Sequence, residues 1–141
     1  MAVFIPDASI TVPWCARDEA SPWTDALLDR LHTGDKALVP PLWVYEVTNT
    51  VLHLKHRNRI TAEEMSRFLD DLRALPIEVD SEGVERVFDR VLMLADRHRL
   101  TVYDASYLEL ALRTGYHLAT QDGDLEKAAR AEQAGLIERT G

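Results

Sequence analysis

Short apolar runs alternate along the chain with longer segments in which apolar residues recur at helical spacing. The short runs predict strands over Ala2–Pro6, Ala37–Val39, Pro76–Val79, His117–Thr120 and Leu136–Glu138. Strands that alternate with helices usually form a parallel sheet with helices on both faces. The pattern therefore predicts an α/β fold. No linker, repeat or low-complexity segment divides the sequence.

Signals at helix ends support the segments between these strands. The predicted helices span Ile10–Ala16, Ser21–His32, Pro40–His56, Thr61–Ala74, Ser81–His98, Asp104–Gly115 and Asp124–Ala134. Ser21 supplies an N-cap, and Pro22 follows it at the first helical position. Thr61 and Glu64 have the spacing of a capping box. Gly115 is the expected C-terminal glycine of its helix.

Acidic residues stand at unusual places in this pattern. Asp7, Glu46, Asp104 and Asp122 each lie in or directly after a stretch with the composition of a core. An unpaired buried charge is expensive, so these positions call for an explanation. Asp7 and Asp122 follow strands, and ligands of open parallel sheets bind beyond the carboxyl ends of the strands. We expect the four carboxylates to form a pocket that a divalent cation can occupy.

Glu46 is the most informative of these residues. It interrupts the otherwise apolar helical stretch Leu42–Leu54. At helical spacing it shares a face with Asn49, Thr50 and His53. The alternative is a thin stripe that faces solvent, but such stripes usually carry pairs of Lys and Glu rather than Glu with Asn and Thr.

Ordinary roles compete for the other carboxylates. Asp7 could be a turn residue or a helix N-cap, and Ser9 supports either role, as a cap or beside a ligand. Asp104 could be a plain N-cap. One of Asp122 and Asp124 could cap the last helix while the other faces the site. Because Asp122 is nearer the end of the strand, it is the preferred ligand, with Asp124 as its support or as the cap.

Composition narrows the classes of function. The chain has 141 residues, which is the usual size of one domain, so we expect a single domain over 1–141. Hydrophobic residues make up 46% of it, as in ordinary globular proteins. Its net charge of −8 excludes a non-specific coat on nucleic acid, although a local basic patch could meet a specific RNA. The acidic excess favours a basic protein partner. The single cysteine, Cys15, excludes an intrachain disulfide and predicts a buried structural thiol. The apolar runs are too short for a signal peptide or a membrane span, so we expect a cytoplasmic protein.

Three segments together resemble one family. They read IPDAS near the start, WVYEVTNTVL in the long helix, and YDASYLELALRTGYHLATQDGDLEKAA towards the end. These segments are similar to the PIN-domain ribonucleases, and among them to the VapC-type toxins of bacterial toxin–antitoxin pairs. The Tyr-Asp-Ala-x-Tyr helix that leads into a strand ending Ala-Thr-x-Asp-x-x-Leu is the most distinctive piece. The resemblance extends from Asp7 to Ala129, and over Thr61–Arg99 it is limited to the helical pattern.

The resemblance implies a fold, a site and partners. The fold would be three-layered, α/β/α, around a central, mostly parallel sheet of four to five short strands. Asp7, Glu46, Asp104 and Asp122 would be the catalytic, metal-binding set. Asn49, Ser9 and Thr120 would be supporting polar residues. Mg²⁺ or Mn²⁺, cleavage of RNA, a homodimer and a cognate antitoxin are implied in the same way.

The chemistry of the residues agrees with this family. Oxygen ligands without His or Cys favour Mg²⁺ or Mn²⁺ over zinc. Two carboxylates about 4 Å apart repel by roughly 4 kcal/mol at an effective dielectric constant of 20, so an empty site should take up protons or bind a cation. A bound cation can polarise a phosphodiester and lower the pKa of its water. No nucleophilic side chain is then required.

Basic residues near the acidic positions are candidates for RNA contact. The candidates are Lys55, Arg57, Arg59 and Arg99. Other basic residues in the same two clusters are His53, His56, Arg97 and His98. The alternative is that they sit at helix C-termini, which favour positive charge. The tryptophans Trp14, Trp23 and Trp43, together with the tyrosines, are expected in the core or at an interface.

Two other classes of protein fit the same fold class. A phosphatase with an Asp nucleophile would have Asp-x-Asp after the first strand, where this chain has Asp7-Ala8-Ser9. A receiver domain would have a Lys after a late strand, where this chain has Thr120-Gln121. A PIN-like binding module without catalysis would be indicated by a lost carboxylate, and all four are present.

Overall fold

A parallel sheet organises the protein in its computed structural model, which describes residues 1–139. Its strands are β1 (Val3–Pro6), β2 (Lys36–Val39), β3 (Ile77–Val79) and β4 (His117–Ala119), in the order β3-β2-β1-β4. All neighbouring strands pair in parallel, so their carboxyl ends meet at one edge. The prediction of one domain over 1–141 includes two C-terminal positions, 140 and 141, that lie outside the described residues.

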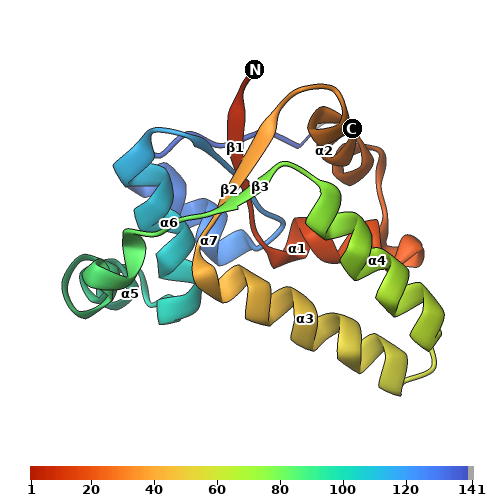
Figure 1. Ribbon diagram of the computed structural model, residues 1–141. Helices are drawn as coiled ribbons and strands as arrows, with labels where there is room; N and C mark the ends of the chain where they lie inside the picture. Colours follow the sequence, from red (N-terminus) through yellow and green to blue (C-terminus); the bar gives the residue numbers. More distant parts are fainter. Residues whose placement is uncertain (140–141) are drawn as a thin grey trace.

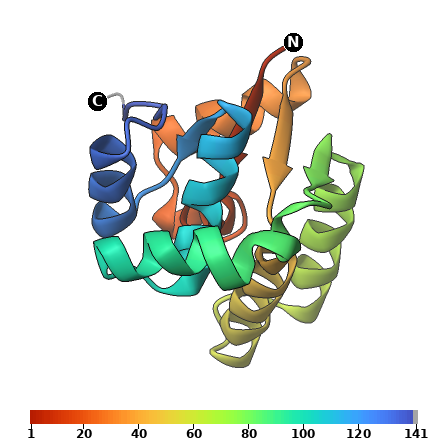
Figure 2. The ribbon, with the colours of Figure 1, turned by 90° about the vertical axis from the view of Figure 1, so that its left-hand side faces the viewer.

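Helices cover both faces of this sheet (Figures 1 and 2). On one side lie α1 (Ala8–Thr11), α2 (Pro22–His32), α3 (Pro41–His56) and α4 (Ala62–Ala74). On the other lie α5 (Leu92–His98), α6 (Val102–Thr114) and α7 (Gly123–Ala131). Short 3-10 helices span Val12–Trp14, Arg17–Glu19 and Gly83–Arg86, and a π-helical turn spans Val87–Val91. The three-layer α/β/α prediction is confirmed.

Local end signals form as the sequence predicts. Ser21 caps α2 and accepts a hydrogen bond from the Thr24 backbone, while Thr61 and Glu64 exchange both bonds of a capping box at α4. Gly115 ends α6 with φ 78°, a left-handed conformation that glycine adopts without strain. Each signal depends on residues within one helical turn, which is why the sequence predicts it well.

Two predicted helices are wrong in their details. The helix predicted over Ile10–Ala16 is instead α1 followed by a 3-10 turn. Pro13 has no N–H to donate to the carbonyl oxygen of Ser9, and the side chain of Gln121 donates to that oxygen instead.

One predicted strand also differs. The segment Leu136–Glu138 forms only a single parallel bridge, between Leu118 and Leu136.

The other helix that differs is the one predicted over Ser81–His98. This segment is instead a 3-10 turn, a π-helical turn and then α5. The start of this segment is fixed by Asp80, whose carboxylate accepts hydrogen bonds from the backbone of Glu82 and Gly83. A Cβ atom on Gly83 would lie 2.6 Å from Asp80 Oδ2, so the close approach requires glycine.

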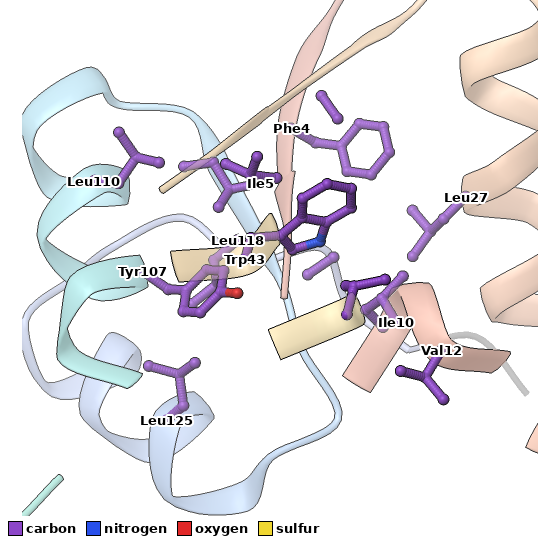
Figure 3. Close-up of a cluster of buried hydrophobic side chains, with 14 of the residues drawn as sticks. Phe4, Ile5, Ile10, Val12, Leu27, Trp43, Tyr107, Leu110, Leu118 and Leu125 are labelled. Atoms are coloured by element: carbon purple, nitrogen blue, oxygen red, sulfur yellow. The ribbon is translucent and has the colours of Figure 1, made fainter. Parts of the chain in front are cut away.

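The core fills both spaces between sheet and helices. Phe4, Ile5, Leu118, Leu125 and other side chains from both helical layers form one buried cluster (Figure 3). Trp14, Trp23 and Trp43 are buried, as predicted. Cys15 is only half-buried, which corrects the expectation of a buried thiol. Within residues 1–139, no helix combines the length and the apolar character needed to cross a membrane.

A buried ion cluster ties the end of β3 to α6. Arg113 on α6 donates to both oxygens of Asp80, at 3.1 and 2.7 Å, and to Glu109 at 2.9 Å. Asp80 and Glu109 are only 7% and 2% exposed. Since α6 also carries Asp104, this cluster fixes the helix that brings a candidate site residue to the sheet edge.

We expect Arg113→Met to destabilise the protein strongly, because it removes the guanidinium group that pairs with two buried carboxylates. Breaking a buried ion pair on one side costs about 3 kcal/mol or more, so the free energy of unfolding in urea should fall by that amount. Arg17→Met, which removes an exposed pair with Asp25, is the matched control and should change little. Equal effects of both variants would contradict the assigned role of the cluster.

Candidate functional site

Asp7 is a buried carboxylate at the carboxyl end of β1. It directly follows the strand, its backbone N–H donates to the Ala119 carbonyl at 3.1 Å, and it is 5% exposed. Although Asp7 occupies the N-cap position of α1, its side chain makes no capping bond. The carboxylate instead accepts hydrogen bonds from Ser9 Oγ at 2.5 Å and from Thr120 Oγ1. The capping alternative for this side chain is therefore wrong.

Burial raises the pKa of Asp7 to about 6. The hydrogen bonds from Ser9 and Thr120 act in the opposite direction, and the negative charge of Asp104 raises the pKa further. The hydrogen bonds to this carboxylate do not offset the effect of burial on its pKa, so a proton or a cation would stabilise it.

The loops that follow β1 and β4 are tied to each other around Asp7. The Gln121 backbone N–H donates to Ser9 Oγ at 2.8 Å, and the Gln121 side chain donates to the Ser9 carbonyl at 2.7 Å. The Asp122 N–H donates to Thr120 Oγ1 at 3.0 Å. Ser9 and Thr120 thus lie where the sequence places supporting residues. Gln121 joins them, and the sequence reasoning did not single it out for this role.

Glu46 approaches the same edge from α3. It is half-buried, and its Oε1 accepts a hydrogen bond from Tyr107 Oη at 2.7 Å. Burial raises its pKa, the Tyr107 bond lowers it, and the charge of Asp104 raises it again. One turn earlier on α3, Trp43 Nε1 donates to Thr11 Oγ1 at 3.0 Å. This contact fixes the position of α3, which carries Glu46, against α1.

Asp104 is the carboxylate that couples the others. It lies in the first turn of α6, but Thr101 is the N-cap and accepts from the Asp104 backbone N–H at 3.0 Å. The N-cap alternative for Asp104 is therefore wrong. Burial raises its pKa, and the charges of Asp122 and Asp124 raise it further. The charge of Asp104 in turn raises the pKa of Asp7 and of Glu46, so Asp104 is linked electrostatically to carboxylates on β1 and on α3.

Asp122 and Asp124, at the start of α7, divide their roles differently from the expectation. Asp122, not Asp124, caps the helix, and its Oδ1 accepts from the Leu125 N–H at 2.9 Å. Asp122 is half-buried and Asp124 is exposed. A carboxylate has two oxygens, so capping leaves Asp122 free to face Asp104 as well.

The four predicted carboxylates lie towards the carboxyl edge of the sheet, but they do not form a compact metal-binding cluster. Among residues 1–139, no three Asp, Glu, His or Cys side chains lie close enough together to hold a metal ion. Asp7, Glu46 and Asp122 each bond within the protein. Asn49 lies one turn beyond Glu46 and is exposed. The four-carboxylate metal set therefore stays a prediction, supported by the mutual effects of its charges.

The basic candidates lie in different settings. Arg59 donates to Asp18 at 2.7 Å and to Glu19 at 3.0 Å, so RNA contact by Arg59 would require these ion pairs to break. Arg57 is exposed after the end of α3, and Lys55 is half-buried in its last turn. Arg99 is exposed and ends α5 in a left-handed conformation with φ 54°.

Tyr107 is a site residue that the sequence reasoning assigned to the core or an interface. Its ring is in the core, but its hydroxyl belongs to the acidic site. The available signal was its position three residues after Asp104, which brings both residues to one side of α6.

The raised pKa of Asp7 predicts a pH-dependent stability in metal-free protein. The folded value, about 6, lies above the ordinary value of 3.8, so the folded state holds a proton that the unfolded chain has already lost. Relative to Asp7→Asn, the wild type should be fully stable below about pH 4 and lose on the order of 3 kcal/mol by about pH 7.

Urea unfolding of both proteins in chelator, across this pH range, measures the difference. Titration of the other carboxylates is largely shared by the two proteins and cancels. A difference that does not change with pH would show that Asp7 is ionised without penalty in the folded protein.

Comparison with protein families and curated proteins gives consistent results. The PIN domain matches residues 4–131 of this chain. Ribonuclease VapC3 from Pyrobaculum aerophilum is 34% identical over 99 residues, which cover 67% of this chain and 68% of that protein. The resemblance to the VapC type of PIN-domain ribonuclease, drawn from the motifs, is confirmed.

Solved structures share the fold over almost the whole chain. PAE2754 from Pyrobaculum aerophilum aligns with a TM-score of 0.69 and 27% identity, covering 97% of this chain and 91% of that one. VapBC2 from Rickettsia felis, bound to a DNA fragment from their promoter, has a TM-score of 0.66 and 14% identity, with coverage of 96% and 97%. FitAcB from Neisseria gonorrhoeae has a TM-score of 0.64 and 16% identity, with 96% coverage of both chains. At these identities the last two support the fold alone. The chain belongs to the PIN domain family.

Proposed function

We propose that this protein is a single-domain, metal-dependent endoribonuclease of the VapC type, the toxin of a toxin–antitoxin pair. PIN domain membership and the likeness to Ribonuclease VapC3 support a nuclease of this type. The single observation that carries the chemistry is the coupling of buried and half-buried carboxylates around Asp104 at the carboxyl edge of the sheet. The reaction is hydrolysis of an RNA phosphodiester bond by an activated water molecule.

The donor set fits Mg²⁺ or Mn²⁺. Asp7, Glu46, Asp104 and Asp122 offer only carboxylate oxygens, which hard divalent cations prefer. Their mutual repulsion and burial raise the pKa of the first three, and a cation would relieve both. When bound, the ion would polarise the phosphodiester and lower the pKa of a water molecule. Asp124, exposed beside Asp122, would support the set.

The chain's own residues would hold these carboxylates in place. Ser9 and Thr120 fix Asp7 through its two oxygens. Asp104 and Asp122 lie at the N-termini of α6 and α7, where the helix dipoles stabilise negative charge. These contacts would keep the carboxylates near the sheet edge before any ligand binds. Asn49, exposed one turn after Glu46 on α3, would be the polar residue that contacts a substrate phosphate.

RNA binding would be local rather than general. The net charge of −8 opposes binding to nucleic acid over the whole surface, so contacts must come from a few basic side chains. Lys55, Arg57 and Arg99 are the candidates that lie outside the ion pairs described above, whereas Arg59 is held by Asp18 and Glu19. The same net negative charge would favour binding to a basic segment of a cognate antitoxin.

We further propose a homodimer, and an exposed apolar surface supports it. Tyr45, Val84, Phe88 and Leu92 are 77%, 65%, 94% and 52% exposed. Tyr45 and Val84 line a cavity of about 220 Å³ between the start of α3, the segment before α5, and α6. Apolar surface of this kind usually marks a protein interface.

Substitution of Asp104 tests the proposed reaction. Purified wild type incubated with total RNA should cleave it in Mn²⁺ or Mg²⁺ and not in chelator. Asp104→Asn removes the charge that couples the set, and we expect cleavage to fall at least 100-fold, which corresponds to about 3 kcal/mol of lost transition-state stabilisation. Gel electrophoresis of the RNA over time measures the rates.

The matched control is Asp71→Asn, which neutralises an exposed aspartate on α4. It should cleave as the wild type does. Cleavage that survives chelator, or equal activity of Asp104→Asn, would refute metal-dependent catalysis by this set. Binding of RNA without any cleavage by the wild type would favour a non-catalytic PIN-like module, and trapping of an acyl phosphate on Asp7 would favour phosphotransfer.

Substitution of Phe88 tests the dimer. Wild-type protein should sediment with twice the mass of the 16.0 kDa chain, and Phe88→Glu should sediment as a monomer because it would bury a charge at the interface. Tyr116→Glu, at a 39% exposed aromatic residue near the amino edge of the sheet, is the control and should remain dimeric. An unchanged mass for Phe88→Glu would exclude this surface as the interface.

A further inference from the structure

The hydrogen bond between Tyr107 and Glu46 joins the two helical layers. Tyr107 is on α6 and Glu46 on α3, which lie on opposite faces of the sheet (Figure 1). The two residues are 61 positions apart, and Tyr107 Oη lies 2.7 Å from Glu46 Oε1. Beyond the carboxyl edge of the strands, this bond therefore connects a helix of one layer directly to a helix of the other.

The Tyr107 ring has little freedom to move. It is 1% exposed and packs in the core cluster that also contains Ile5, Leu118 and Leu125. Figure 3 shows the ring among these side chains, with its hydroxyl oxygen pointing away from α6. A buried tyrosine hydroxyl requires a polar partner, and phenylalanine would fill the same core space without that requirement. The hydroxyl at this position thus serves a polar contact, and that contact is a candidate metal ligand.

The hydroxyl opposes a force that would separate the acidic residues. Glu46 is half-buried on a flexible side chain, and the charge of Asp104 repels it. Without a donor, Glu46 would turn towards solvent or take up a proton. An ionised carboxylate only accepts hydrogen bonds, so the Tyr107 hydroxyl is the donor in this contact.

We propose that Tyr107 is a positioning residue of the carboxylate site: its hydroxyl holds Glu46 near Asp104 so that both can bind one divalent cation. Asp104 and Tyr107 are one turn apart on α6, so this helix presents a charge and a hydrogen-bond donor to Glu46 together. The donor takes one lone pair of Oε1 and leaves Oε2 available. This inference rests on the proposed function, because it assigns Tyr107 a role in the same site.

Cation binding without RNA is the direct test. Titration calorimetry with Mn²⁺ measures the dissociation constant for the wild-type protein and for Tyr107→Phe. Loss of a hydrogen bond to a metal ligand typically weakens binding 10- to 100-fold, and that range is expected here. Tyr116→Phe, which removes a hydroxyl far from the site, should bind as the wild type does. Near-UV circular dichroism checks that each variant is folded.

A mutant cycle shows whether Tyr107 acts through Glu46. In the Glu46→Gln background, Tyr107→Phe should change the Mn²⁺ dissociation constant less than about twofold, since the partner carboxylate is already gone. Replacement of Tyr107 by 4-aminophenylalanine, which returns a donor at the same place, should restore most of the affinity. A full loss of affinity in the Glu46→Gln background, or no rescue by the amino group, would overturn the proposal.

The outcomes also separate this inference from the proposed function. Equal Mn²⁺ affinity of wild type and Tyr107→Phe, with binding lost in Asp104→Asn, would overturn the role of Tyr107 and leave the carboxylate site standing. Absence of Mn²⁺ binding by the wild type, or wild-type affinity in Asp104→Asn, would overturn the site itself and this inference with it.

Discussion

The buried carboxylate of Asp7 is the constraint around which the site is arranged. It lies where β1 and β4 end side by side, and the loops that follow both strands supply hydroxyl donors to it. These donors lower its pKa without cancelling the effect of burial. At neutral pH a charge held in this way lowers the stability of the folded protein, and a bound cation would offset that cost.

The remaining acidic residues come to this edge on different helices, and the fold determines how they meet. A parallel sheet places all strand ends together, so helices of both layers start or pass there. Glu46 comes from one layer, and Asp104 and Asp122 come from the other. Tyr107 links the layers by a hydrogen bond, and the Arg113 cluster fixes α6 to β3. The site therefore depends on the packing of both layers.

The sequence predicts what depends on near neighbours. The four strands of the sheet, the N-caps at Ser21 and Thr61 and the glycine end of α6 follow from a few consecutive residues and are confirmed. The turn before α5 could not be predicted, because Asp80 is held by Arg113, which is 33 positions away. The hydrogen bond from Tyr107 to Glu46 joins residues 61 positions apart, so it could not be predicted from the sequence either. Asp122 and Asp124 are two positions apart, and only the backbone geometry at the start of α7 decides that Asp122 is the cap.

We propose that repulsion among the carboxylates at this edge makes the site a receptor for Mg²⁺ or Mn²⁺. Crystals grown with Mn²⁺ and measured for anomalous scattering test it most directly. The claim predicts one or more Mn²⁺ peaks within about 2.0–2.4 Å of carboxylate oxygens, including those of Asp7 and Asp104. Density without a Mn²⁺ peak at this edge, or peaks bound only to surface carboxylates elsewhere, would contradict it.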